Sequence, residues 1–426
     1  MSSNPSPPAS ATNFTLCVTA MCVALALLWV CSLDAAALSQ RLGYAPLIPC
    51  LGIIAVLAVS EWLWPALTVA AARSIAHGAV RPLDIGRVGV RIWGVAVTLG
   101  LVALAYWLFP EYRGDFYNPF WKFLRSIAPA AVLIPVYLVW ADRRIAEPHD
   151  EYYAFGALVS GRWAAADWRL IRRHLLGWGV KAFFLPLMTV YLSDEVRALQ
   201  EAFRFLGTGT MPLYQAFYHL TYTVDLMFCV VGYSVAMRLF DAQIRSVEPT
   251  AAGWVVALIC YQPFYSVIGR VYLNYDDNIY WDNWLETWPL VRAGWAAAII
   301  VLISIYSLCT VSFGLRFSNL TNRGIITGGP YRFSKHPAYL TKNLSWWLIS
   351  VPFVSDQGWS MAVRNCCLLA LLNGLYYARA RTEERHLSND PVYVAYALWM
   401  NEHGLLRHLS QALPFLRYRP PRAESA

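Results

Sequence analysis

The sequence contains ten stretches of mostly apolar residues, and most of them are about as long as a membrane-spanning helix. A helix needs about 20 such residues to cross the hydrocarbon core of a bilayer. By that criterion the candidate spans lie at about 14–33, 45–66, 88–109, 126–142, 175–193, 216–237, 251–269, 289–312, 344–357 and 360–378. The ninth stretch is short, so we expect it to form a tight hairpin with the tenth.

Charged residues make up only 14% of the 426 residues, whereas apolar residues make up 58%. Soluble globular chains carry about a quarter charged residues, so this chain has too few charges to cover a water-exposed surface. The composition excludes a disordered chain, a disulfide-stapled secreted domain and an ordinary soluble enzyme. The predicted fold class is therefore all-α: a polytopic integral membrane bundle of about ten transmembrane helices.

Basic residues are concentrated in alternate loops between the candidate spans. One set of loops carries clusters such as Arg143–Arg144 and Arg172–Arg173, whereas the other set carries few, such as Arg270. Because Lys and Arg favour the cytoplasmic side, we expect both termini in the cytoplasm. The net charge of +8 is explained by these loops and does not indicate nucleic acid. All but four of the 34 basic residues are arginine, a composition that favours a bacterial inner membrane.

The chain divides by composition into three parts. Residues 1–13 are polar and rich in Pro and Ser, so we expect a disordered lead. Residues 14–288 form an aromatic-rich transmembrane bundle, and residues 289–426 carry a denser set of polar motifs. Ionisable residues inside a bilayer are costly and often functional. The first bundle contains five such residues: Asp34, Glu61, Arg91, Lys181 and Asp225. We expect them either to form interhelical pairs or to line a cavity.

The first motif lies in the loop TNRGIITGGPYRFSKHPAYLTKN, residues 321–343. Gly328, Gly329 and Pro330 predict a turn whose backbone can approach a ligand closely. Pro337 favours an extended conformation at His336, which projects the imidazole from a fixed backbone. Aromatic and cationic side chains surround it in the sequence. The alternative interpretation is a basic loop that contacts lipid headgroups.

The second motif lies in ARARTEERHLSNDPVYVAYALW, residues 378–399. On a helix, Arg379 and Glu383 are four residues apart, and Arg381 and Glu384 are three residues apart, so each pair shares a face. By itself this pattern is also typical of a solvated helix with surface ion pairs, which contribute little to stability.

The two motifs together, separated by a hydrophobic helical hairpin, are more specific than either one. In this order they resemble the isoprenylcysteine carboxyl methyltransferase and phospholipid methyltransferase superfamily, over roughly residues 295–418. The resemblance implies an integral membrane enzyme that uses S-adenosylmethionine. Its acceptor would be lipid-soluble: an isoprenylcysteine carboxylate, a phospholipid or an isoprenoid-like molecule.

The resemblance also implies roles for individual residues, and it requires no metal. A carboxylate after the last span would pair with the cofactor's amino group, and Arg381 would face an anionic acceptor. The implied catalytic residues are Lys335, Arg381 and Glu384, and the implied cofactor-binding residues are Gly329, Pro330, Tyr331, His336, Pro337, Tyr339, Asn343 and Glu383. Lys335 stands where the family usually has arginine, so bidentate carboxylate recognition is lost there.

Two other functions remain open from the sequence. A sterol-reductase-like enzyme would bind a reduced nicotinamide at the His336 region, although that family favours Asn-Tyr after its histidine. A transporter or lipid-binding membrane protein would retain the motifs without catalysis. In every case the expected partners are the membrane and a lipid or prenylated small molecule, with no role for nucleic acid.

Overall fold

A computed structural model describes residues 6–33, 44–63 and 80–420, and nearly all of its regular structure is helical. The helices in chain order are α1 (Phe14–Leu33), α3 (Leu47–Leu63), α4 (Ile85–Leu108), α5 (Asn118–Ile127), α6 (Leu133–Asp142), α7 (Glu151–Val159), α8 (Trp168–Arg204), α9 (Thr210–Ser234), α10 (Ala251–Leu258), α11 (Phe264–Val267), α12 (Trp281–Trp284), α13 (Pro289–Ser312), α14 (Pro337–Ser350), α15 (Trp359–Leu387), α16 (Pro391–His403) and α17 (Arg407–Ala412). Two short strands, β1 (Ser246–Val247) and β2 (Thr321–Asn322), pair antiparallel.

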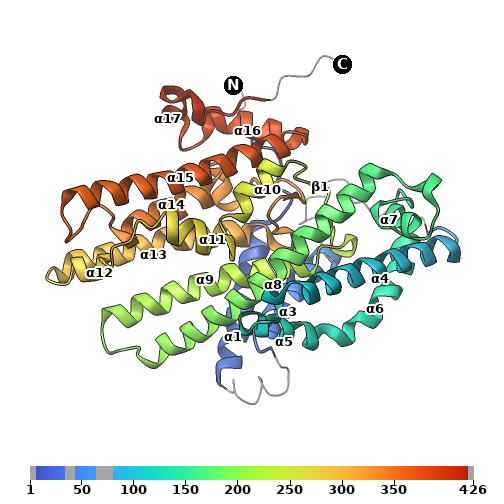
Figure 1. The fold of residues 1–426 in the computed structure, drawn as a ribbon, viewed down its shortest axis with the longest axis horizontal. Helices are drawn as coiled ribbons and strands as arrows, with labels where there is room; N and C mark the ends of the chain where they lie inside the picture. The colour runs from blue at the N-terminus through green and yellow to red at the C-terminus, as the bar shows by residue number, and fades with distance from the viewer. Residues whose placement is uncertain (1–5, 34–43, 64–79, 421–426) are drawn as a thin grey trace.

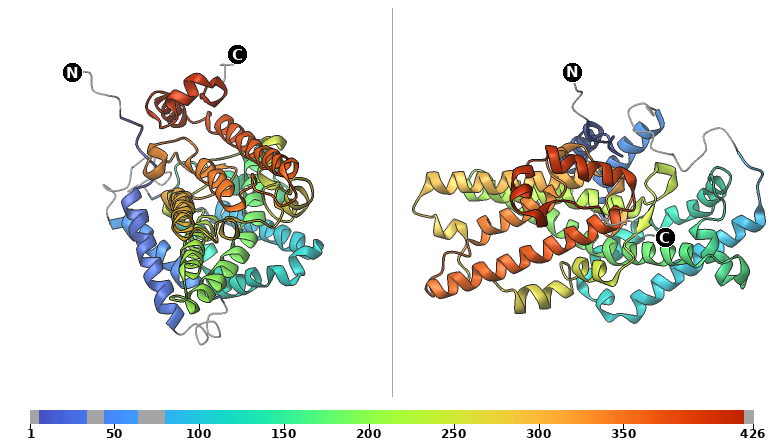
Figure 2. Two further views of the ribbon diagram at one scale, coloured as in Figure 1. Left: turned by 90° about the vertical axis from the view of Figure 1, so that its left-hand side faces the viewer. Right: turned by 90° about the horizontal axis from the view of Figure 1, so that it is seen from above.

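The axes of the long helices α9, α13 and α15 lie roughly parallel, and α8 lies obliquely to them (Figure 1). Helix α9 packs against both α8 and α13, and α13 packs against α14, while α10 contacts α15. The two compositional blocks of the sequence therefore share one set of packed helices. The short helices α16 and α17 lie outside the layer of long helices in both side views (Figures 1 and 2).

Five helical segments of the described chain are long and apolar enough to cross a membrane. They are Phe14–Ser32, Ile85–Leu108, Asp115–Asp142, Trp168–Arg204 and Pro289–Ser312. The all-helical membrane fold is thus supported, but the expected number of about ten spans is not confirmed. Helix α3 is apolar but too short, and α9 is a continuous helix that carries many polar side chains.

The span expected at 251–269 is not one helix. Helix α10 ends at Leu258, and α11 together with a π-helical turn (Ile268–Tyr272) follows after a break. Pro263 lies in this break, and proline lacks the amide hydrogen that a continuing helix needs. The break turns Tyr261 toward α15, where it becomes part of the candidate site described below.

The hairpin expected at 344–357 and 360–378 has different bounds. Helix α14 begins at Pro337, a residue whose fixed φ suits the first turn of a helix, and it ends at Ser350. Helix α15 runs without interruption from Trp359 to Leu387. The charged first part of the second motif, up to Leu387, is therefore the end of this apolar helix, and the rest of the motif continues into α16.

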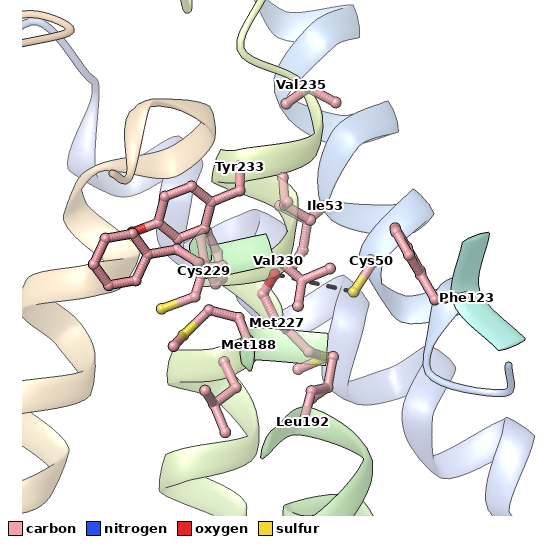
Figure 3. Packing of buried hydrophobic residues seen from close by; sticks show 14 of the residues in the cluster. Cys50, Ile53, Phe123, Met188, Leu192, Met227, Cys229, Val230, Tyr233 and Val235 are labelled. Carbon is pink, nitrogen blue, oxygen red and sulfur yellow. Dashed lines mark hydrogen bonds between the residues drawn. The ribbon is translucent and has the colours of Figure 1, made fainter. Parts of the chain in front are cut away.

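A large hydrophobic core holds α8 and α9 against α3 and α5 (Figure 3). Met188 and Leu192 of α8 meet Met227 of α9, and Ile53 of α3 packs on the same cluster. Cys50 is a free thiol buried in this core, where its Sγ lies 3.9 Å from the Met227 carbonyl oxygen. This core fixes the N-terminal bundle on which the motif-bearing helices are packed.

The ionisable residues of the N-terminal bundle differ in their partners. The buried Arg91 lies 3.1 Å from Asp150 and 3.6 Å from Asp142, so it forms the expected interhelical pairs. Asp225 accepts a long hydrogen bond from Tyr306 on α13. Lys181 has no carboxylate partner among the described ion pairs. The side chains of Asp34 and Glu61 fall outside the described residues.

The N-terminal lead, expected to be disordered, is ordered from residue 6 onward and lies on the first motif. The Ala11 amide donates to the Ile325 carbonyl at 2.8 Å, and the Thr327 hydroxyl donates to the Pro8 carbonyl at 2.7 Å. The Thr12 hydroxyl also donates to the Ser312 carbonyl at 2.6 Å. These hydrogen bonds attach the polar segment to the chain around the first motif, a contact that its composition does not predict.

Arg323 joins the two halves of the molecule. Its guanidinium is buried and donates to four backbone carbonyls, at distances of 2.6 to 2.8 Å. Two of these carbonyls belong to Gly232, in the last turn of α9, and to Ala242, in the chain that follows it. The other two belong to Leu315 and Phe317, just after α13. The side chain therefore fixes the start of the motif loop on the N-terminal bundle.

Replacing Arg323 with methionine should destabilise the whole fold. An unsatisfied buried polar group costs ~1–3 kcal/mol, and this change leaves four carbonyls without their donor, so we expect a loss of about 3 kcal/mol or more. Thermal unfolding of the purified protein in detergent measures this loss. The control is Arg417→Met, which removes an exposed ion pair with Glu402; an equal effect of the two changes would contradict the role of Arg323.

Candidate active site

The Gly-Gly-Pro turn of the first motif is built by packing. Gly329 has a φ of +59° and begins a 3-10 helix (Gly329–Arg332) in which Pro330 occupies the first turn. A Cβ at Gly329 would lie 2.6 Å from the Ser312 hydroxyl and 2.7 Å from the Phe14 ring. The turn thus requires glycine both for its backbone conformation and for its close contact with α1.

Tyrosine side chains hold the remainder of the motif loop. The Tyr396 hydroxyl on α16 donates to the Tyr331 carbonyl at 2.6 Å, with a longer contact to the Ser334 carbonyl. Tyr331 packs edge-to-face on Phe313. His336 then precedes α14, and Pro337 occupies the first turn of that helix. The loop therefore delivers the imidazole from a fixed backbone, as the sequence predicts.

Glu384 joins the two motifs. Its carboxylate is buried on α15 and lies 2.7 Å from the Lys335 ammonium, 3.2 Å from His336 Nε2 and 2.5 Å from the Arg381 guanidinium. Burial opposes its ionisation, but the hydrogen bonds and charges of His336 and Lys335 outweigh burial and lower its pKa to about 2. Glu384 is therefore ionised at neutral pH within a cluster that has excess positive charge.

Glu383 is next to Glu384 on α15, but its carboxylate contacts a different residue, on α14. Its carboxylate accepts a hydrogen bond of 2.8 Å from the Tyr339 hydroxyl. The Tyr339 ring is stacked on the His336 ring, with centroids 5.5 Å apart. The two adjacent glutamates thus contact different groups, and His336 and Tyr339 lie between them.

Arg379 does not pair with Glu383 as the helical spacing suggested. Its guanidinium lies over the rings of Tyr261 and Tyr339, 5.6 and 5.4 Å from their centroids, and it donates to Asn319 Oδ1. Tyr261 lies in the break after α10, and Asn319 lies after α13. Arg379 therefore connects three segments that are distant in the sequence.

Two pockets flank His336 and Tyr339. The first, here called the inner pocket, encloses about 980 Å³ of space, part of it open to solvent. It lies between α10, α13, α14 and α15, and seven tyrosine and phenylalanine rings line it together with polar and charged side chains. Its lining includes Tyr261, Tyr306, Phe313, Phe317, Asn319, Tyr331, His336, Tyr339, Lys342, Tyr376, Arg379 and Glu383.

The second, here called the C-terminal pocket, has about 930 Å³ and lies between α14, α15 and the chain from α16 onward. It has a charged rim and an apolar remainder. Its lining includes Phe333, Lys335, His336, Tyr339, Asn343, Asn373, Tyr376, Tyr377, Arg381, Glu384, Asn401 and Phe415. His336, Tyr339 and Tyr376 line both pockets, so these three rings form the wall between them.

Two buried amide atoms in the C-terminal pocket have no hydrogen-bond partner among the described residues: Asn343 Oδ1 and Asn373 Nδ2. The other end of the Asn373 amide is occupied, because its oxygen accepts from Trp347 at 2.7 Å. Unsatisfied buried polar atoms are rare in native proteins. A donor and an acceptor are thus available to a polar ligand in this pocket.

A comparison with known families identifies the segment that carries both motifs. Residues 290–389 match the family model of isoprenylcysteine carboxyl methyltransferases. The match confirms the resemblance over nearly all of α13 and over all of α14 and α15. No curated protein and no solved structure gives a match. The walls of both pockets extend beyond the matched segment, to Tyr261 on one side and Phe415 on the other.

The structure distributes the implied site residues over three environments. Tyr331 and Glu383 line the inner pocket, whereas Lys335, Asn343, Arg381 and Glu384 line the C-terminal pocket. His336 and Tyr339 line both. Gly329, Pro330 and Pro337 are not among the lining residues, and their contacts shape the loop.

Sequence reasoning missed several lining residues. Tyr376 and Asn373 precede Glu384 at helical spacing on α15, so a helix that continued through the motif would have pointed to them. Lys342, one turn after Tyr339, lies over the rings of Tyr306, Trp346 and Tyr376. No local pattern could have indicated Tyr261, which reaches the site only through the break after α10.

The depressed pKa of Glu384 predicts a pH-dependent stability. A carboxyl whose pKa is about 2 in the folded protein and about 4.5 in the unfolded chain stabilises the fold above pH 4.5. This contribution, about 3 kcal/mol, is lost as pH falls from 4.5 toward 2. Unfolding of wild type and Glu384→Gln between pH 2 and 7 measures it. If the stability of the two proteins changed with pH in the same way, the lowered pKa of Glu384 would be contradicted.

Proposed function

We propose that this protein transfers a methyl group from S-adenosylmethionine to a lipid-soluble acceptor at the cytoplasmic side of a membrane. The match of residues 290–389 to a methyltransferase family supports the reaction class. The observation that carries the finer proposal is the wall of His336, Tyr339 and Tyr376 between two pockets that otherwise have different linings. A transferase needs two adjoining sites of this kind, one for each substrate.

We assign the donor to the C-terminal pocket because its groups fit a zwitterion. The amino-acid end of S-adenosylmethionine carries an ammonium and a carboxylate. Lys335 and Arg381 supply cations for the carboxylate, and Glu384 supplies an anion for the ammonium while it positions both cations. Asn343 and Asn373 present unsatisfied amide atoms to the nucleoside part. When bound, the cofactor supplies an electrophilic methyl group on a sulfonium ion.

We assign the acceptor to the inner pocket. Its aromatic walls lie between helices, where they suit an apolar molecule that enters from the bilayer. Arg379 and Lys342 line this pocket and form no ion pair among the described residues, so two cations are available to an anionic head group. The carboxylates of Glu248 and Glu383 lie in the same lining. An isoprenylcysteine carboxylate, a phospholipid and an isoprenoid acid all have this combination of an apolar chain and a charged end.

The residues of the wall act by positioning. Methyl transfer is an in-line displacement, for which alignment of the reacting groups and exclusion of water provide much of the acceleration. The stacked rings of His336 and Tyr339 are held by Glu384 and Glu383, respectively. They therefore keep the boundary between the pockets at a fixed place and limit access of water to it.

The donor assignment predicts different effects for the two adjacent glutamates. Glu384→Gln should weaken binding of S-adenosylmethionine by about 10- to 100-fold, the effect of one lost charge-assisted contact. Glu383→Gln should leave that affinity within about 3-fold, because it faces the other pocket. Calorimetry on detergent-purified protein measures both, and each variant is the matched control for the other.

Three results would contradict the proposal. If Glu383→Gln weakened binding of S-adenosylmethionine more than Glu384→Gln, the assignment of the pockets would be wrong. Binding of a reduced nicotinamide in place of S-adenosylmethionine would indicate a reductase. Failure of the folded wild-type protein to bind either cofactor would favour the transporter or lipid-binding function.

A further inference from the structure

A third pocket lies in the N-terminal bundle, outside the segment that matches the methyltransferase family. It has about 430 Å³ of space between α6, α7, α8 and the chain that follows α9. We call it the α8 pocket, because Arg173, His174, Trp178 and Lys181 line it from successive turns of that helix. It shares no lining residue with the two pockets of the candidate active site.

Several nitrogen atoms in the α8 pocket lack partners. Arg173 Nε and Trp178 Nε1 are buried and have no hydrogen-bond partner among the described residues. The Lys181 ammonium lies 4.6 Å from the Trp178 ring centroid, and the ion pairs of the described chain include no carboxylate for it. Buried donors without acceptors are costly. Two such donors beside the Lys181 ammonium therefore indicate a ligand that supplies acceptors.

The charge of the α8 pocket favours an anion. Arg173, Lys181 and Arg238 line it, against the single carboxylate of Glu151. That carboxylate is already engaged, because it lies 2.6 Å from Arg173 and 3.5 Å from Arg238. Lys181 thus has no ion pair of its own among the described residues, and a ligand that contacts its ammonium there carries a negative charge.

The hydrogen bonding of His174 indicates which group the anion must also carry. The Thr98 hydroxyl donates its one proton to the Gly94 carbonyl at 2.8 Å, so its oxygen accepts from His174 Nε2, also at 2.8 Å. This fixes the imidazole proton on Nε2. His174 Nδ1 is then an acceptor in the neutral ring, and it is buried without a partner among the described residues.

We propose that the α8 pocket binds a protonated phosphate group. Its unprotonated oxygens accept from Lys181, Trp178 and Arg173, and its one hydroxyl donates to His174 Nδ1. A carboxylate or a sulfate has no such hydroxyl at neutral pH, and neither has a phosphodiester. The ligand is therefore inorganic phosphate or a phosphate monoester, and a lipid with a phosphomonoester head group has the same chemistry.

Thermal unfolding of the full-length protein in detergent tests this proposal. Inorganic phosphate at pH 7 should raise the unfolding temperature in a saturable way, and sulfate at equal ionic strength should act more weakly. In lipid nanodiscs, phosphatidic acid should stabilise the protein more than phosphatidylcholine if the group belongs to a lipid. An effect of free phosphate without an effect of phosphatidic acid would identify a soluble ligand of the same chemistry.

Two variants locate the effect. Lys181→Met and Trp178→Phe should each weaken the phosphate response by about 10-fold, as expected for one lost charge-assisted or buried hydrogen bond. Lys122→Met, at an exposed lysine, should leave the response unchanged. Without phosphate, Lys181→Met should unfold at the same or a higher temperature, because a buried ammonium without a carboxylate is itself destabilising.

The proposal fails under clear conditions. Equal responses to phosphate and sulfate would indicate a general salt effect. A phosphate response that persists in both variants would place the ligand elsewhere. If Lys181→Met lowers the unfolding temperature in the absence of phosphate, its ammonium has a structural role that excludes the proposed one. If the lysine variant does not fold, the phosphate response of Trp178→Phe still tests the proposal.

Discussion

The four hydrogen bonds of the buried Arg323 determine where the motif loop begins. They attach the chain just after α13 to the end of α9, and a guanidinium is suited to this task because it presents several donors in one plane. The loop that follows carries His336 and Tyr339. Both pockets of the candidate site therefore depend on an interaction about a dozen residues before His336, between the two compositional halves of the chain.

Glu384 forms the second connection. It brings together Lys335 and His336 from the loop and Arg381 from its own helix, so the two motifs form one site only when its carboxylate is ionised. This explains why the ordered pair of motifs is more informative than either half. Each half alone is a basic loop or a charged helix, and the specific arrangement exists only between them.

Apolar runs predicted α1, α4 and α13 well, because a continuous helix is the main way to bury backbone polar groups in a bilayer. The prediction failed at 251–269, where Pro263 breaks the helix, and at α15, which continues through the charged motif. The pairing of Arg381 with Glu384 followed from helical spacing. The contacts of Arg379 with Tyr261 and Asn319 did not, because they depend on how three distant segments pack.

Under the proposed function, the chemistry and the substrate choice are separated along the chain. The wall of His336, Tyr339 and Tyr376 lies within the segment that matches the methyltransferase family. Part of the lining of each pocket comes from outside that segment, from the chain between β1 and the break after α10 for the inner pocket and from the chain after α15 for the C-terminal pocket. Residues outside the matched segment can therefore change the shape of either pocket and leave the wall intact. Under the proposed function, Tyr261 therefore contributes to acceptor choice from outside the matched segment.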